Sequence, residues 1–178
     1  MRIKTLFAVL VKASVWASLF FIFSASSIMA QKDKEQTATP EKALEMLRKY
    51  EIPVAFYDKL QAQETGWQLI RFFPPQPIDN PKNTFVLHFR KGDNQAGVYI
   101  YEYETAAKAA EFSILNIHIS SGRVEEYNRY GDEGKKIYGN RGFSSLSYRK
   151  NRFVVSIYCD DEKTAERFAG YFSDAVNF

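Results

Sequence analysis

The side chains that could carry out catalysis or hold a metal ion are few in this chain of 178 residues. It contains two histidines, His88 and His118, and one cysteine, Cys159. A zinc site needs several such residues at short spacings, so the sequence predicts neither a metal site nor a disulfide scaffold. It also lacks the Gly-x-Ser-x-Gly motif of serine hydrolases and the glycine-rich motifs that bind phosphate, so no cofactor is predicted.

A pair of carboxylates is the best candidate for acid–base chemistry. Glu102 and Glu104 lie two positions apart, so on a strand they share one face with their Cα atoms about 7 Å apart. That separation would suit the two carboxylates of a glycosidase. Acidic residues also stabilise the start of a helix, and Asp160 and Asp161 lie at a similar position. The sequence therefore predicts no catalytic residue and keeps a hydrolase of an envelope or extracellular polymer as the alternative.

Cys159 ends an apolar run, and its spacing indicates packing. Phe153, Val155 and Ile157 would lie with it on one face of a strand. A free cysteine packs as a small apolar side chain, so we expect it in the core. A helix expected just after it leaves a nucleophilic role as the alternative.

The first 30 residues differ in character from the rest of the chain. A basic start precedes an apolar stretch at 13–23, and small residues lead to Ala30 before a polar segment begins at Gln31. This pattern is typical of a secretory signal peptide, here residues 1–30 with cleavage after Ala30. We therefore expect a protein exported to the periplasm or secreted, without a membrane span after cleavage. A retained anchor helix is the alternative.

The formal net charge of +3 comes from this N-terminal segment. The chain has 24 Lys and Arg against 21 Asp and Glu, and Arg2, Lys4 and Lys12 precede its first acidic residue, Asp33. The chain after residue 30 therefore carries equal numbers of the two signs. A neutral, exported domain gives no reason to expect a nucleic-acid partner.

Residues 40–178 are expected to form a single α+β domain after a flexible lead at 31–39. A helix begins with Thr39 as N-cap and Pro40 in the first helical position. An ambiguous apolar stretch at 54–60, a strand at 67–73 and a proline-rich loop at 74–81 follow it.

The rest of the chain contains two copies of a strand–strand–helix repeat. Tyr99, Tyr101 and Tyr103 match Val155, Ile157 and Cys159 at a constant offset of 56 positions. The expected elements are strands at 84–90 and 98–104, a helix from Thr105 to Ile117, strands at 143–149 and 153–159, and a helix from Asp160 or Asp161. The order ββαββα is a circular permutation of the ferredoxin-like order. It predicts a two-layer α+β sandwich with an antiparallel sheet and both helices on one face, plus the N-terminal helix and strand.

Three short motifs resemble those of small exported bacterial domains of unknown function. They are Gly66-Trp67 near the domain start, Gly131-Asp132-Glu133-Gly134 before the last hairpin and helix, and Tyr148-Arg149-Lys150 before the turn of that hairpin. The resemblance covers about half of the chain. It implies an exported protein and an α+β fold, and it implies no activity and no functional residues.

The face of the sheet opposite the helices is the predicted binding surface. The repeat places Tyr99, Tyr101 and Tyr103 under the helices. It places Leu146, Tyr148, Val154, Tyr158, His88 and Ile100 on the opposite face, and the N-terminal segment could simply cover that face. The predicted binding residues are Tyr148, Tyr158, His88, Arg149 and Arg141, together with the glycine-rich segment 131–142. We therefore expect a small exported binding domain for an unknown protein or cell-envelope ligand, with homodimerisation through this face as a further option.

Overall fold

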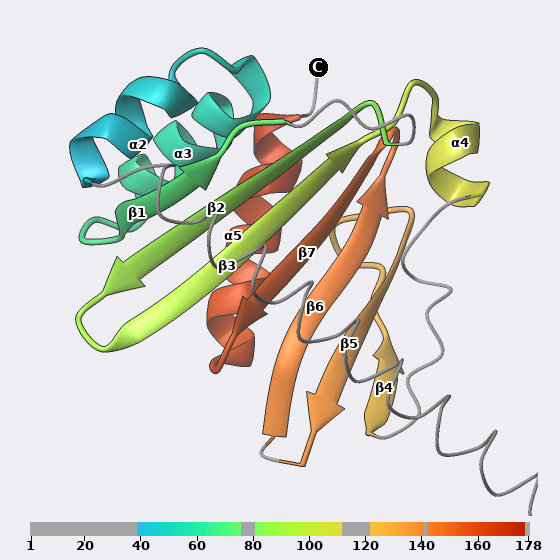
Figure 1. The fold of residues 1–178 in the computed structure, drawn as a ribbon. Coiled ribbons are helices and arrows are strands. Elements are labelled where there is room, and N and C mark those ends of the chain that lie inside the picture. Colours follow the sequence, from blue (N-terminus) through green and yellow to red (C-terminus); the bar gives the residue numbers. More distant parts are fainter. Residues whose placement is uncertain (1–38, 76–80, 112–121, 141, 177–178) are drawn as a thin grey trace, which may run out of the picture. The chain divides into compact units, whose positions relative to one another are not determined.

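The described part of the chain is built on a seven-stranded antiparallel sheet with strand order β1-β2-β3-β7-β6-β5-β4 (Figure 1). The computed structural model describes residues 39–75, 81–111, 122–140 and 142–176. These residues belong to one unit, Thr39–Phe178, and no described helix is long and apolar enough to cross a membrane. The predicted signal peptide, most of the lead, His118 and Arg141 lie outside the described residues.

Four described helices accompany the antiparallel sheet, so the α+β class is confirmed. The helices are α2 (Pro40–Leu47), α3 (Glu51–Gln63), α4 (Ala106–Glu111) and α5 (Glu162–Ala175). The strands are β1 (Gln68–Phe73), β2 (Asn83–Lys91), β3 (Asn94–Glu102), β4 (Arg123–Glu126), β5 (Glu133–Gly139), β6 (Gly142–Lys150) and β7 (Phe153–Cys159). The sequence did not predict β4, and of β5 it indicates only a short central strand at Lys136-Ile137-Tyr138. With seven strands in the sheet, the permuted ferredoxin-like order is not confirmed.

Local sequence explains where the helices begin. The hydroxyl of Thr39 accepts a hydrogen bond from the backbone N–H of Lys42, as predicted for the N-cap of α2. Asp161 caps α5 in the same way, accepting from the N–H of Thr164 at 2.8 Å. Pro53 lies in the first turn of α3, where its missing N–H costs nothing, so the ambiguous stretch 54–60 is helical.

One face of the sheet carries the core. The helices α3 and α5 pack on this face, and in Figure 1 both lie behind the strands. Phe56 of α3 makes edge-to-face contacts with Phe89 of β2 and Phe168 of α5, with ring centroids 6.0 Å apart in each pair. The buried strand residues beneath them are Phe85, Leu87, Phe89, Val98, Ile100, Leu146, Tyr148, Val155 and Ile157.

The predicted face of β3 is wrong. Antiparallel pairing joins Val98 to Ile157 and Tyr99 to Ser156, so Tyr99 and Tyr101 point away from α5. The offset of 56 positions matched Tyr99 with Val155 and so placed both on the same face of the sheet. In the structure β3 and β7 are antiparallel neighbours, and Tyr99 lies opposite Ser156 instead. This difference of one residue moves the tyrosines of β3 to the other face. Tyr148, Leu146 and Ile100 consequently belong to the core, while Val154, Tyr158 and His88 lie on the opposite face as predicted.

The helix expected after β3 does not share the face of α5. Ala109 of α4 clusters with Val154, Tyr101 and Tyr103, and the first two of these partners point away from α5. The place beside α5 is taken by α3, from the N-terminal part of the chain. The expected residues 112–117 of that helix lie outside the described residues. The N-terminal helices thus cover the core face, so the described part of the N-terminal segment does not cover the predicted binding surface.

The Gly-Asp-Glu-Gly motif holds β5 against β6. A Cβ atom at Gly131 would lie 2.4 Å from the carbonyl oxygen of Arg149, and one at Gly134 would lie 2.5 Å from that of Tyr127. The carboxylates between these glycines, Asp132 and Glu133, pair with the guanidinium of Arg149 at 2.8 and 2.9 Å. The motif therefore has a structural explanation in close backbone approach and charge pairing.

Candidate functional site

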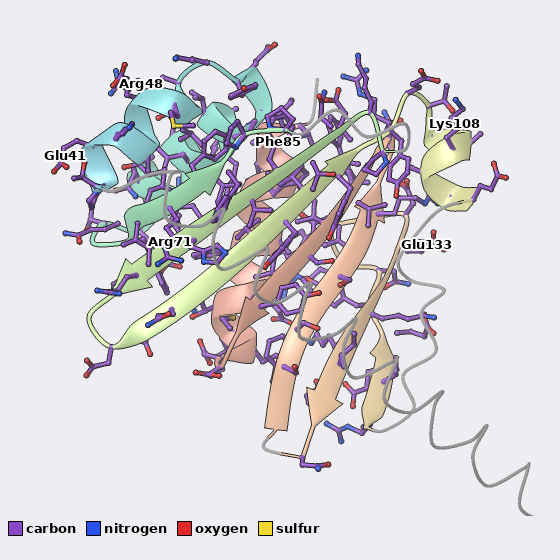
Figure 2. The ribbon with its side chains drawn as sticks, in the orientation of Figure 1. Glu41, Arg48, Arg71, Phe85, Lys108 and Glu133 are labelled. Carbon is purple, nitrogen blue, oxygen red and sulfur yellow. The ribbon has the colours of Figure 1, made fainter. Side chains whose placement is uncertain are left out.

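A hollow of about 580 Å³ opens on the sheet face opposite α3 and α5. Figure 2 shows the side chains of this face, on which Arg71 of β1 projects from one side. The volume falls within the range of roughly 300–1,000 Å³ that is usual for small-molecule sites. Its described lining residues are His88, Phe89, Gln95, Ala96, Gly97, Tyr99, Gly139, Asn140, Gly142, Phe143, Ser144, Tyr158, Cys159 and Asp160.

The early end of β7 creates this hollow. The last pairings of β7 join Ala96 to Cys159 on one side and Ser145 to Tyr158 on the other. Its neighbour β3 begins two residues earlier than Ala96, and β6 begins at Gly142, so both neighbours run past the end of β7. The β2–β3 and β5–β6 hairpins lie on either side of the end of β7 (Figure 1). Residues of both hairpins line the hollow.

The floor of the hollow is a residue without a side chain. Gly97 lies between His88 on β2 and Tyr158 on β7 in the register of the sheet. A Cβ atom built there would meet only the ring of Tyr99, at an ordinary 3.5 Å. Backbone strain therefore does not explain this glycine, and its effect is to leave open space between two aromatic side chains.

Aromatic rings form one wall of the hollow. Tyr99 and Tyr158 meet edge to face with centroids 5.3 Å apart, and Tyr99 also contacts His88 at 6.4 Å. Burial raises the pKa of Tyr99, with a smaller contribution from Tyr158, so its hydroxyl stays protonated at neutral pH and can donate. Tyr158 is 46 % exposed, which is unusual for a tyrosine on the central strand of a sheet.

The other wall and the rim are polar. Asn140 and Ser144 come from the β5–β6 hairpin, Gln95 comes from β3, and Asp160 follows β7; all four are exposed. Among the described residues that line the hollow there is no lysine or arginine. The site thus offers amide and hydroxyl groups that can donate or accept, together with one carboxylate that accepts.

Two of the five predicted binding residues meet at this hollow, namely His88 and Tyr158. Tyr148 was placed on the wrong face: it is fully buried, and its hydroxyl donates to the carbonyl oxygen of Ala169 at 3.0 Å. Arg149 is engaged by Asp132 and Glu133, away from the hollow lining. Arg141 lies outside the described residues, although both of its neighbours in the chain line the hollow.

The carboxylates of the hydrolase alternative are each held by a cation. Glu102 is buried, accepts a hydrogen bond from Asn83 at 2.7 Å and pairs with Arg152 at 3.0 Å. Glu104 is exposed, and its hydrogen bond from Lys108 lowers its pKa. A catalytic acid needs a raised pKa, so this environment of Glu104 runs opposite to the requirement.

Cys159 lies between the large hollow and a smaller one of about 180 Å³ on the side of α5. Its thiol donates to the carbonyl oxygen of Asp161, and burial raises its pKa to about 11. The thiol is therefore protonated at neutral pH, which disfavours a nucleophilic role and agrees with packing beside the core.

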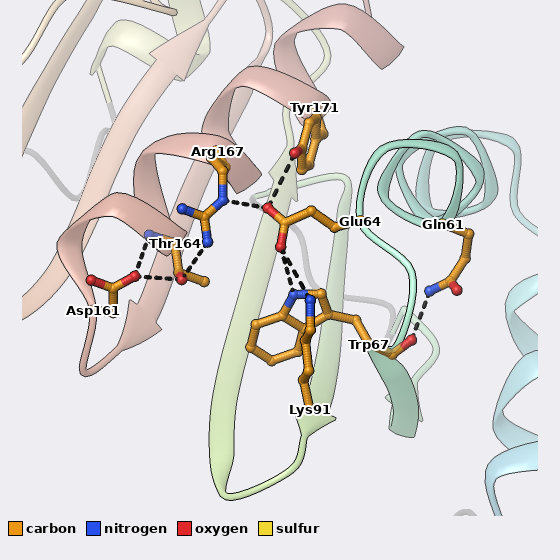
Figure 3. Close-up of polar contacts among 8 residues, drawn as sticks. All are labelled: Gln61, Glu64, Trp67, Lys91, Asp161, Thr164, Arg167 and Tyr171. Carbon is orange, nitrogen blue, oxygen red and sulfur yellow. Dashed lines mark hydrogen bonds and ion pairs between the residues drawn. The ribbon is translucent and has the colours of Figure 1, made fainter.

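A second polar cluster centres on Glu64, at the end of α3 (Figure 3). Its carboxylate accepts from Trp67, Arg167 and Tyr171, and lies 3.8 Å from the ammonium group of Lys91. Burial raises the pKa of Glu64, but these hydrogen bonds outweigh burial and leave the pKa below its usual value. Because the ring of Trp67 also packs on Phe168 at 5.1 Å, the cluster joins α3, β1, β2 and α5 and explains the Gly66-Trp67 motif structurally.

Sequence reasoning missed most of the hollow. Gln95, Asn140, Ser144 and Asp160 are ordinary loop and strand-end residues whose types alone suggest nothing. One signal was available, since Gly97 interrupts a strand of alternating residues, and such a glycine often marks a close approach or an open space.

Comparisons with known proteins do not assign a family or a function to this chain. No family model, no curated protein and no solved structure matches the chain. Its function must therefore be argued from the chemistry of the hollow.

Proposed function

We propose that this chain is a small exported binding domain that takes its ligand in the hollow on the open face of the sheet. The observation that carries the proposal is the combination of Gly97, which leaves the floor empty, with Tyr158 exposed beside it. A tyrosine in this position buries apolar ring surface when a ligand binds, while its hydroxyl keeps a polar partner. The partner class is a protein or a cell-envelope ligand.

Export rests on the sequence pattern of residues 1–30, which also carry the excess of basic residues in the chain. The protein recovered from the periplasm or the medium should begin at Gln31, and intact-mass measurement checks this. A full-length mass in the exported fraction would favour the anchor alternative. Recovery only from the cytoplasm would contradict export.

Capture from cell-envelope extract tests the binding role. The immobilised protein should retain material from the extract, and Tyr158→Ala should lose most of it. The matched control is Val124→Ala, because Val124 is the other large apolar side chain described as exposed, at 42 %, and it lies on β4 outside the hollow.

Equal retention by all three proteins would contradict binding through the hollow, as would no retention by any. Circular dichroism should show the same fold in each variant, since both changes are at exposed positions.

A further inference from the structure

We infer that the ligand of the hollow is an uncharged carbohydrate chain, bound with a sugar ring against Tyr158. The inference rests on the proposed binding function and narrows its ligand class. Three properties of the hollow support it: the form of its aromatic wall, the neutral polar groups opposite that wall, and the charges of the described lining.

The aromatic wall suits a saturated ring. A sugar ring has a face of C–H groups that is apolar, and such a face packs against an aromatic ring while hydroxyls project from the edge. Tyr158 presents an exposed ring, and Tyr99 supports it from the side at 5.3 Å. Gly97 adds no side chain of its own beside this pair, and the ring of Tyr99 lies 3.5 Å from where its Cβ atom would be.

The polar groups match hydroxyls. Gln95, Asn140 and Ser144 each provide both donors and acceptors, and a sugar hydroxyl is itself both a donor and an acceptor. Asp160 adds a carboxylate that accepts from two hydroxyls without needing a cation. These groups come from both hairpins that flank the end of β7, so a ring lying on Tyr158 has polar partners on two sides.

The charges of the described lining disfavour other classes of ligand. The described lining has no lysine or arginine to neutralise a phosphate or sulfate, and Asp160 would repel one. A quaternary ammonium ion would be attracted by Asp160 and by the rings, but it would form no hydrogen bonds with the two amides and the hydroxyl, which a sugar can bind. A neutral ligand rich in hydroxyls satisfies all of these groups.

The hollow is open where β3 and β6 pass the end of β7, so a ligand chain can continue beyond it in either direction. This geometry fits internal units of a polymer better than a single enclosed sugar. The expected ligand is therefore an oligosaccharide, with one or two units in contact with the protein.

The test uses defined probes on the full chain. Maltopentaose, cellopentaose and chitopentaose are titrated separately, and binding is followed by backbone amide shifts in NMR spectra. At least one of the three should shift the amides of Gly97, Ser144 and Tyr158, and leave that of Val124 in place. Choline chloride and a neutral tripeptide are the competing probes.

Two variants sharpen the result. Tyr158→Ala should weaken binding about tenfold or more, as for a central aromatic contact. Gly97→Thr should do the same by filling the floor, because a side chain there meets no backbone obstacle and threonine suits a strand. Val124→Ala should bind like the unchanged protein.

The proposal is overturned if none of the three glycans shifts these amides, if choline or the tripeptide does so in their place, or if both hollow variants bind normally. Failure of the binding function itself looks different. Suppose that capture of envelope material requires Tyr158, and that the captured material resists periodate but is destroyed by protease. The binding function would then stand, and the proposal of a carbohydrate ligand would be wrong.

Discussion

The same strands form both faces of this sheet, but one face packs in the core and the other carries the hollow. On β3, Val98 and Ile100 are buried beneath the helices, while Gly97 and Tyr99, which alternate with them, line the hollow. On β7, Val155 and Ile157 lie in the core, whereas Tyr158 is the most exposed large side chain of the strand. Successive side chains of a strand point to opposite faces, so neighbouring residues contribute either to the core or to the proposed binding site. Substitutions on the two faces should therefore fail in different assays.

The largest difference is expected between the two tyrosines proposed for binding. Tyr148→Ala removes a fully buried ring and should lower the free energy of unfolding by about 3–5 kcal/mol. Tyr158→Ala should change it by less than about 0.5 kcal/mol while removing most of the ligand capture. Urea unfolding monitored by circular dichroism measures both. A comparable loss of stability in the two variants would remove the division between the faces.

The glycine-rich segment offers the next comparison, because its two halves differ. Gly134→Ala places a Cβ atom within 2.9 Å of two carbonyl oxygens and should cost about 1–3 kcal/mol of unfolding free energy. Gly139 has no heavy atom within 4 Å of such a Cβ, so Gly139→Ala should be neutral or stabilise by about 0.5 kcal/mol. Thermal unfolding of the pair checks this. Destabilisation by Gly139→Ala would contradict the open rim.

On the core face, Glu64 should make a pH-dependent contribution to the free energy of unfolding. The folded pKa of Glu64 lies below its unfolded value, so its contribution is present above the unfolded pKa and is lost as pH falls through the folded one. Glu64→Gln should therefore lower stability at pH 7 by about 1–2 kcal/mol, as for hydrogen bonds to a charged group. The gap to the unchanged protein should narrow below about pH 4.

The control for this prediction is Glu104→Gln, because Glu104 is exposed and pairs only at the surface with Lys108. It should leave stability unchanged at both pH values. A gap for Glu64→Gln that stays constant from pH 7 to pH 3 would show that packing, and not charge, holds the cluster.

A smaller loss of stability than that of Glu64→Gln is expected at the centre of the open face. The hydroxyls of Ser147 and Ser156 are 2.9 Å apart and both residues are buried. Each single change to alanine should cost about 1 kcal/mol, because the remaining hydroxyl loses this partner. The double variant should cost less than the sum of the singles, and a double-mutant cycle measures that coupling. Strict additivity would contradict the bond.

Hydrophobic periodicity predicted the elements better than their orientation. The caps Thr39 and Asp161 and the strands around β2, β3, β6 and β7 follow from local patterns, which need no knowledge of neighbours. Strand β4 was missed because Arg123–Glu126 is too polar to read as a strand, and it lies at the edge of the sheet.

The faces could not be read from periodicity, because a strand of alternating apolar and aromatic residues is compatible with either face. Only the pairing of Tyr99 with Ser156 decides which set is buried. The hollow depends on the same tertiary information, since it exists where β7 ends before its neighbours. His88 and Tyr158 were found by their types, and their partners across the gap carry no such signal.

Substitutions at Gly97, in the floor of the hollow, could change the depth of the hollow without changing the core. Position 97 has an ordinary strand backbone, and a Cβ atom there meets only the side chain of Tyr99, at 3.5 Å, so small side chains can be introduced with little effect on folding. A series from alanine to threonine at this one position would set the depth of the hollow step by step. The protein could thus acquire selectivity for smaller or flatter ligands while its core stays untouched.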